Sequence, residues 1–403
     1  MADAHTVAVT LSDGSEVDVW DRYTITLDML RAGNAWTFSF WHTETLRTTW
    51  ALMRAKVKCG DNLSVSVDGA AQVTGRIESI ATHVDRKGGA VMIVSGRDLG
   101  GIAESWDADP TVRLRGLPLS DALAALFAPL GIPVVVSADA AAVRAVQTGT
   151  TRNARGVSRS STHRRSQPVD RSHPRAGEKV WQLADEMCRR LGFLLWVAPC
   201  ADGGLAVVVD APAYDVPESY SFSRRVVGGV ATGNILMSVE TLDTKAVPTE
   251  VNVYSGTTRG DLISNRQRSQ TFNVALEDAV VNRGFVAEPM PAQVRHVQSG
   301  RARTLTASAA EGARLVAEAM AGLRRVDITV QGHGQTVAGT SKLYAINTMA
   351  RVYDDMTTSA AGDPLDESML VTRVVMSGSR QAGTETQLTL VPKGSVVVVP
   401  NDG

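Results

Sequence analysis

The chain has 403 residues, of which 44% are apolar and 21% charged, and its formal net charge is -1. This length accommodates roughly two to four domains, and the composition is ordinary for a globular protein. A near-zero charge excludes a general attraction to nucleic acid or to acidic membranes. No apolar run reaches the about 20 residues that span a bilayer, so we expect no membrane insertion. The first residues lack the features of a signal peptide, and the three cysteines, which share no metal-ligand spacing, are expected to be small core residues.

Residues 1–98 have the pattern of many short strands. Apolar and polar residues alternate over residues 6–11, 23–27 and 36–41, as in strands with one buried face. Short strands at close, even spacing predict an antiparallel barrel or sandwich rather than an α/β sheet. We therefore expect a first β-barrel domain here.

Three aromatic residues, Trp36, Phe38 and Phe40, fall on one face of the expected strand 36–41. Such a stripe, or Trp41 next to it, could form a platform for a sugar. Large aromatic side chains on one strand face more commonly belong to a core. We expect core and keep the glycan platform as the alternative.

Two hairpins far apart in the chain share one pattern. In each copy a strand ending in Asp is followed by a strand, a turn containing glycine and another strand; the stretches are 63–68, 75–80 and 90–96 early, and 349–354, 369–376 and 384–391 late. Loose self-similarity of this kind indicates one β-module used twice. Residues 327–403 are therefore expected to hold a second barrel and a C-terminal tail, whose residues 396–399 could add to a sheet edge.

The segment 99–215 is expected to be a small α/β module. Ser120 is placed to cap a short helix, and residues 180–191 have the helical spacing of apolar residues, with Gly192 as the C-cap. Two strands, 193–197 and 205–209, follow. This pattern predicts a helix packed on a β-hairpin.

An arginine-rich insert, 144–175, interrupts this module. It has one acidic residue and too few aliphatic side chains to bury a core. It could be an arm that binds an acidic partner surface, a nucleic-acid contact, or a solvated loop; the absence of interleaved aromatic residues argues against specific nucleic-acid binding. The partner-contact candidates are Arg155, Arg159, Arg164, Arg165 and Arg171.

The segment 216–326 is expected to connect the two barrels. It contains strands within 239–254, which are candidates for the second barrel, and an irregular polar stretch. A helix is expected to begin at Ser308, with Glu311 completing a capping box, and to end at Arg324 and Arg325. A further strand is expected to begin at Asp327.

No catalytic constellation stands out. His333 lies in a Gly-His-Gly turn, and the acidic groups Asp354-Asp355 and Asp363, Asp366, Glu367 lack the spacing of a calcium loop and are expected in solvated turns. No His-Glu-x-x-His pair or Gly-x-Ser-x-Gly elbow is present. We therefore assign no catalytic, cofactor or metal residues and do not expect an enzyme.

The order of these elements resembles the baseplate hub proteins of Mu-like contractile-tailed phages, which are related to the late control D and spike-hub families. The resemblance rests on residues 177–183, 343–348, 350–355, 370–375 and 383–390, taken in sequence. Tyr344 stands where many relatives would have Trp, and the insert 144–175 departs from the family pattern.

The resemblance implies a fold and a mechanism. It implies two tube-protein-like barrels in each chain, so that a homotrimer presents six and adapts a sixfold tail tube to a threefold central spike. It further implies contacts with wedge proteins and, as a further candidate partner, the tape measure protein. DNA would pass through the lumen without specific binding, in a virion assembled in the host cytoplasm. The alternatives are a tail-associated cell-wall hydrolase and a host-glycan-binding module.

Overall fold

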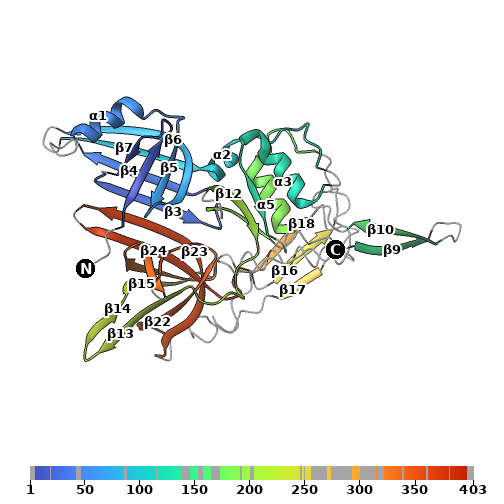
Figure 1. Cartoon of the computed structure of the whole chain (residues 1–403). Helices are drawn as coiled ribbons and strands as arrows, with labels where there is room; N and C mark the ends of the chain where they lie inside the picture. Colours follow the sequence, from blue (N-terminus) through green and yellow to red (C-terminus); the bar gives the residue numbers. More distant parts are fainter. Residues whose placement is uncertain are drawn as a thin grey trace.

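The structure is a computed structural model. It describes residues 5–18, 20–41, 47–85, 89–114, 117–137, 146–152, 158–164, 173–190, 193–199, 204–245, 247–248, 250–255, 270–273, 293–299, 312, 315, 322–337, 340–359, 362–380 and 382–396. The chain is mainly β, with two large β units on one side and a helical module beside them (Figure 1). No described helix has the length and apolarity needed to cross a bilayer.

The first β unit is built by the N-terminal part of the chain. Its strands are β1 (Val7–Leu11), β2 (Glu16–Val17), β3 (Arg22–Asp28), β4 (Ala35–Trp41), β5 (Asn62–Val67), β6 (Ala70–Asp85) and β7 (Gly89–Asp98). They pair in the order β1-β5-β6-β7-β4-β3, with every pairing antiparallel. Alternate residues are buried, as the period-two pattern predicted. A helix, α1 (Arg47–Lys56), lies between β4 and β5 in the chain.

The second β unit repeats this arrangement. Its strands are β13 (Tyr220–Val227), β14 (Val230–Gly233), β15 (Ile235–Leu242), β19 (Arg324–Gln331), β22 (Thr348–Thr358), β23 (Pro364–Ser379) and β24 (Gly383–Pro392). They pair in the order β13-β22-β23-β24-β19-β15, which is the same order along the chain as β1-β5-β6-β7-β4-β3. One pairing differs, because β13 is parallel to β22 whereas β1 is antiparallel to β5.

The repeated hairpin predicted from the sequence is confirmed and matches residue by residue. Strands β6 and β23 have 16 residues each, and β7 and β24 have 10 each. The spacing of 294 positions between Ala70 and Pro364, the first residues of β6 and β23, recurs at every end of these four strands. Each pair is interrupted by one register shift, at Glu78 and at Thr372, which are again 294 positions apart. The same hairpin, including its irregularity, is therefore built twice.

Neither β unit closes into a barrel within the described residues. No pairing joins β3 back to β1 or β15 back to β13, and the two units instead form one 14-stranded sheet. The expectation of two closed barrels is therefore not met. The physical reason in the first unit is that the edge of β3 pairs with β23 of the second unit. One continuous hydrophobic core fills both units.

The middle module confirms the predicted packing of helices on a hairpin. Helices α2 (Leu99–Ser105), α3 (Leu119–Phe127) and α5 (Val180–Arg190) pack with the small sheet β8 (Val134–Val136), β11 (Leu194–Pro199) and β12 (Leu205–Asp210) around a separate core. Phe127 and Trp181 meet edge to face there. Pro118, and not Ser120, is the N-cap of α3, so that expected cap is wrong.

Several further expectations change in detail. Cys188 is buried but Cys59 is exposed, so not every cysteine is a core residue, and Cys200 lies outside the described residues.

The expected helix before residue 326 also changes. Arg324 and Arg325 begin strand β19 and do not end a helix. Ser308 and Glu311 lie outside the described residues. Strand β15 joins the large sheet, whereas β16 (Glu250–Ser255) pairs with β17 (Gln270–Asn273) and β18 (Val294–Ser299) in a separate one. A last hairpin joins β20 (Gly334–Val337) to β21 (Thr340–Leu343).

Candidate assembly interface

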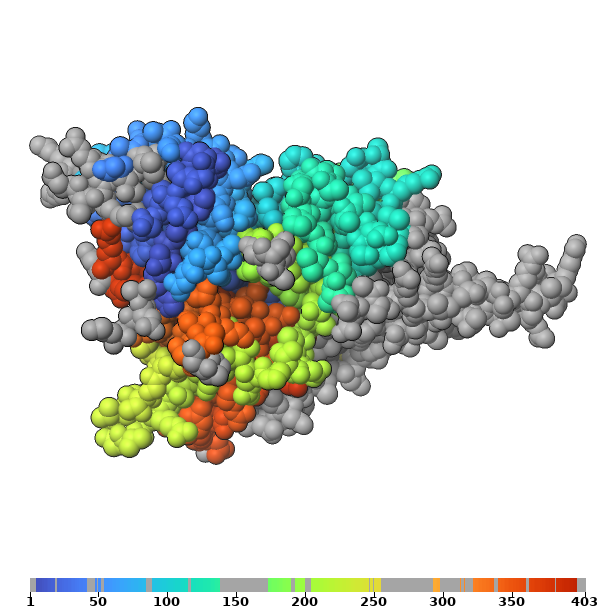
Figure 2. Space-filling model, viewed as in Figure 1, coloured from blue at the N-terminus to red at the C-terminus, as the bar shows by residue number. Residues whose placement is uncertain are grey.

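The two β units are joined edge to edge by strands β3 and β23. They pair antiparallel, from Arg22 opposite Ser379 to Asp28 opposite Arg373. Along the same edge, the first half of β23 pairs with β22 of its own unit, and the second half pairs with β3 of the other unit. Figure 2 shows the first unit lying directly on the second.

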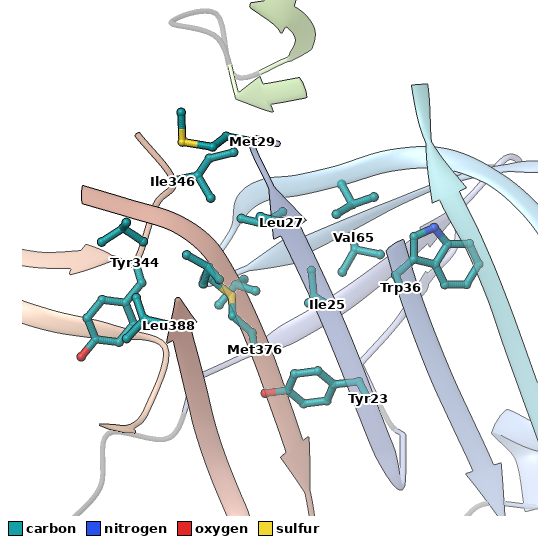
Figure 3. Close-up of a cluster of buried hydrophobic side chains, with 14 of the residues drawn as sticks. Tyr23, Ile25, Leu27, Met29, Trp36, Val65, Tyr344, Ile346, Met376 and Leu388 are labelled. Carbon is teal, nitrogen blue, oxygen red and sulfur yellow. The ribbon is translucent and has the colours of Figure 1, made fainter. Parts of the chain in front are cut away.

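This junction is tightly packed. Tyr23, Ile25 and Leu27 of β3 are buried, and Met376 of β23 lies beside them in Figure 3. Opposite Tyr23 stands Gly378, where a Cβ atom would lie 2.4 Å from the tyrosine ring. Glycine is therefore required at this position for the two strands to approach while the ring fills the core.

A buried histidine, His333, forms a hydrogen bond across the same junction. The Tyr23 hydroxyl is hydrogen bonded to Nε2 of His333, while Nδ1 of His333 lies 2.9 Å from the hydroxyl of Thr386. Because that hydroxyl donates to the carbonyl oxygen of Gly332, Nδ1 is the donor and Nε2 accepts from Tyr23. Burial lowers the pKa of His333 to about 4, which keeps the ring neutral, as this pattern requires. The residue singled out in the sequence thus has a structural role.

The acidic residues 354 and 355 do not lie in a solvated turn but in strand β22. Burial acts to raise the pKa of Asp354, but hydrogen bonds from Arg224, Ser238 and Thr357 outweigh it and hold the pKa below its ordinary value. Asp355 accepts from the amide of Val226. Within the described residues no three His, Cys, Asp or Glu side chains converge as metal ligands.

In the other acidic group, Asp366 and Glu367 lie in strand β23 and form ion pairs, whereas Asp363 is exposed in the turn before β23, as expected. Asp366 lies 2.8 Å from Arg351. Glu367 and Glu240 both contact Arg324, which is 1% exposed. Arg324 is therefore a buried cation held between carboxylates from β15 and β23. Asp366 and Glu367 thus have structural partners.

The aromatic stripe of β4 lies in the core. Trp36, Phe38 and Phe40 are each 1% exposed, and their rings pack against one another. Only Trp41, at the end of the strand, is partly exposed. The expectation of a core is confirmed, and a glycan platform on the stripe is ruled out because the rings do not reach the surface.

The arginine-rich insert contains a hairpin. Strands β9 (Val146–Arg152) and β10 (Ser158–Arg164) pair antiparallel and project away from the rest of the chain in Figure 1. Arg159 and Arg164 lie on β10, whereas Arg155, Arg165 and Arg171 lie outside the described residues. Along these two strands the insert is therefore a β-hairpin and not an irregular loop.

A pocket of about 370 Å³ lies where the two β units meet the middle module. Its walls are Leu27, Ala70, Gln72, residues 197–199 and residues 341–346. This lining has no carboxylate, histidine or cysteine. The pocket therefore does not supply the paired carboxylates that a cell-wall hydrolase would need.

Asp98 links the first unit to the middle module through a buried carboxylate. Its Oδ1 accepts hydrogen bonds from the amides of Gly100 and Gly101 and so caps helix α2. Burial raises the pKa of Asp98 to about 6. A raised pKa means that folding favours the protonated form, so the stabilising contribution is complete below the unfolded value and is lost as the pH rises through about 6.

Asp98→Asn is therefore expected to stabilise the protein at pH 8, because the amide keeps the capping oxygen without the buried charge. The expected gain is about 1–3 kcal/mol at pH 8, falls to roughly a third of that value at pH 4.5, and vanishes below the unfolded pKa. Urea unfolding at both pH values measures it, with exposed Asp18→Asn as the control. An equal effect of Asp98→Asn at both pH values would contradict the assignment.

Residues 7–98 match the family described as Mu phage baseplate assembly protein GpP-like, N-terminal. The fold is similar to that of the tail protein from Neisseria meningitidis MC58, with a TM-score of 0.68, 20% identity and 97% of each chain covered. It is also similar to the 43 kDa tail protein of prophage MuSo2 from Shewanella oneidensis, with a TM-score of 0.70, 16% identity and coverage of 97% of this chain and 99% of that one.

A more distant likeness is to prophage tail protein gp18 from Listeria monocytogenes EGD-e, with a TM-score of 0.51 and 11% identity over 96% of this chain and 94% of that one. Comparison with curated protein sequences gives no match. The resemblance drawn from the sequence is confirmed at this level: residues 7–98 match the Mu phage GpP-like baseplate assembly family, and the chain as a whole shares its fold with these phage tail proteins.

Proposed function

We propose that the protein is the hub of a phage tail baseplate, a homotrimer that adapts a sixfold tail tube to a threefold central spike. The observation that carries this proposal is the internal repeat. Two β units share one strand order, and their central hairpins correspond at a constant spacing of 294 positions. Three chains then supply six similar units, so that a threefold trimer can match the six subunits in each ring of the tail tube.

The internal junction supports a ring rather than an arbitrary cluster. The β3 edge of one unit meets the β23 edge of the next, so the two units are related head to tail. Head-to-tail contacts generate closed rings when the rotation closes. Six units in such a ring would surround a channel, and DNA would pass through it without specific contacts, consistent with a formal net charge of -1.

The remaining partners follow from the same proposal. The tail tube protein would lie on one face of the ring and the central spike protein on the other, with wedge proteins around them and the tape measure protein as a further candidate. The β9–β10 hairpin, which carries Arg159 and Arg164, is our proposed contact with an acidic neighbour. The protein would accordingly reside in the virion, at the tail baseplate.

Multi-angle light scattering of the purified chain tests the oligomeric state. A mass of three chains is expected across a range of protein concentrations. A monomer at every concentration would contradict the trimeric hub. A dimer would contradict it equally, because two chains supply four units and cannot match a sixfold tube.

A further inference from the structure

The internal repeat assigns an equivalent to each strand at the β3–β23 junction. Strand β6 of the first unit corresponds to β23, because the spacing of 294 positions relates them throughout. Strand β15 of the second unit corresponds to β3, because each is the neighbour of the matching strand, β19 or β4. The match extends to the sequence, since Thr26-Leu27-Asp28 aligns with Thr241-Leu242-Asp243.

The two equivalent edges are not paired with each other inside one chain, nor with any other described strand. The outer edge of β6 pairs with β5 only up to Arg76, which leaves residues 79–85 without a partner strand on that side among the described residues. Strand β15 pairs with β19 on one edge, and no described strand pairs with its other edge. An unpaired edge offers its amide and carbonyl groups to another strand.

Most of residues 79–84 in β6 are more exposed than their equivalents in β23, because no described strand covers this edge of β6. Val374 and Met376 of β23 are 0% exposed because β3 lies beside them. Their equivalents in β6 are Ile80, which is half-buried, and Thr82, which is exposed. Val84 is 78% exposed, although its equivalent in the second unit, Gly378, is buried.

Strand β15 shows the same difference from β3. Tyr23, Ile25 and Leu27 are buried in β3, whereas the residues at the same places in β15, Ser238, Glu240 and Leu242, are only half-buried. Along this strand Leu236, Met237 and Val239 are 54%, 52% and 46% exposed. A run of exposed apolar side chains on an unpaired strand marks a place where another chain binds.

We propose that β15 of one subunit pairs antiparallel with residues 79–85 of β6 in the next subunit. The occupant of each edge is thus a second copy of this chain. The register follows from the internal junction: Asp243 lies opposite Ser79 as Asp28 lies opposite Arg373, and Met237 lies opposite Asp85 as Arg22 lies opposite Ser379. This inference rests on the proposed trimer and specifies how its subunits join.

The side chains fit this register. Leu242 falls opposite Ile80, an apolar pair equivalent to Leu27 and Val374. At the position where Gly378 leaves room for the ring of Tyr23, the intersubunit junction places Val84 opposite Ser238. In the internal junction the larger side chain, Tyr23, lies on β3 opposite glycine. In the intersubunit junction the larger side chain, Val84, lies on β6 opposite the small Ser238, so one large and one small residue still share the space. Three such contacts alternate with three β3–β23 junctions around a ring of six units.

Cysteine cross-linking tests the register. His83→Cys with Val239→Cys, in a chain where Cys59 and Cys200 are serine, places two thiols directly opposite each other across the subunit boundary. Opposed residues in an antiparallel pair have Cβ atoms about 4.5–5.5 Å apart, close enough for a disulfide after mild oxidation. Each chain carries both cysteines, so the expected product is a covalently closed trimer that reducing agent returns to monomer.

Two matched pairs control the experiment. Thr24→Cys with Ser377→Cys is the same pair in the internal junction, and should form a disulfide within one chain without increasing the mass. Val84→Cys with Val239→Cys is shifted by one residue, which sends the two side chains to opposite faces and should give no trimer.

The outcomes separate this inference from the proposed function. A trimer by light scattering in which His83→Cys and Val239→Cys do not cross-link, or in which the shifted pair cross-links better, overturns the register and leaves the hub intact. A protein that is monomeric by light scattering contradicts both proposals.

Discussion

Arg324→Met is expected to destabilise the folded chain by about 3–5 kcal/mol, the largest effect of a single substitution that we foresee. Arg324 is 1% exposed and holds Glu240 and Glu367 at 2.8 and 2.9 Å. Methionine fills a similar volume but leaves these two carboxylates without their buried cation. Chemical unfolding followed by circular dichroism measures the loss.

The neighbouring arginine is the matched control. Arg325 is exposed and lies 3.4 Å from Asp327, so Arg325→Met should cost less than about 1 kcal/mol. Adding Glu240→Leu and Glu367→Leu to Arg324→Met should recover much of the stability, because the unpaired charges are then gone. Equal effects of the two single arginine substitutions would show that Arg324 is not a buried bridge.

Gly378→Val is expected to weaken the junction between the two β units by about 1–3 kcal/mol, because there is no room for a Cβ beside the ring of Tyr23. That ring is itself held by the hydrogen bond between its hydroxyl and His333. It cannot move aside without breaking this bond and opening the core. Thermal unfolding of the variant should show a lowered Tm.

A double-mutant cycle identifies the ring as the cause. Tyr23→Ser alone removes buried aromatic area and is also destabilising. In combination with Gly378→Val it reproduces the valine–serine pair proposed between subunits, so the double variant should lose clearly less than the sum of the two single variants. Strict additivity would mean that Gly378 is needed for its backbone and not for the space that it leaves.

The repeated hairpin could be predicted from the sequence because its signals are local. Alternating apolar residues define each strand, and Gly89 and Gly383, which both have positive φ, begin the returning strands of the two hairpins. The aromatic stripe of β4 was correctly expected in the core for a similar reason. The sequence also indicated the family resemblance, because it preserves the order of these elements.

The features that depend on distant partners could not be predicted. Arg324 follows a stretch with a helical pattern, and only its ion pairs with strands β15 and β23 show why it opens a buried strand. The pairing of β3 with β23 joins residues about 350 positions apart, and no local pattern encodes the choice of that edge over β1. For this reason, two closed barrels were expected where the chain forms one shared sheet. The matching register shifts of the two hairpins, at Glu78 and Thr372, become evident only in the structure.

Electron cryomicroscopy of the purified oligomer, reconstructed without imposed symmetry, would show whether the β units form a ring of six. We expect three chains whose six β units alternate around one ring, with β15 of each chain beside β6 of the next. A single chain, or an oligomer in which the first and second units occupy different radii or separate rings, would contradict this arrangement.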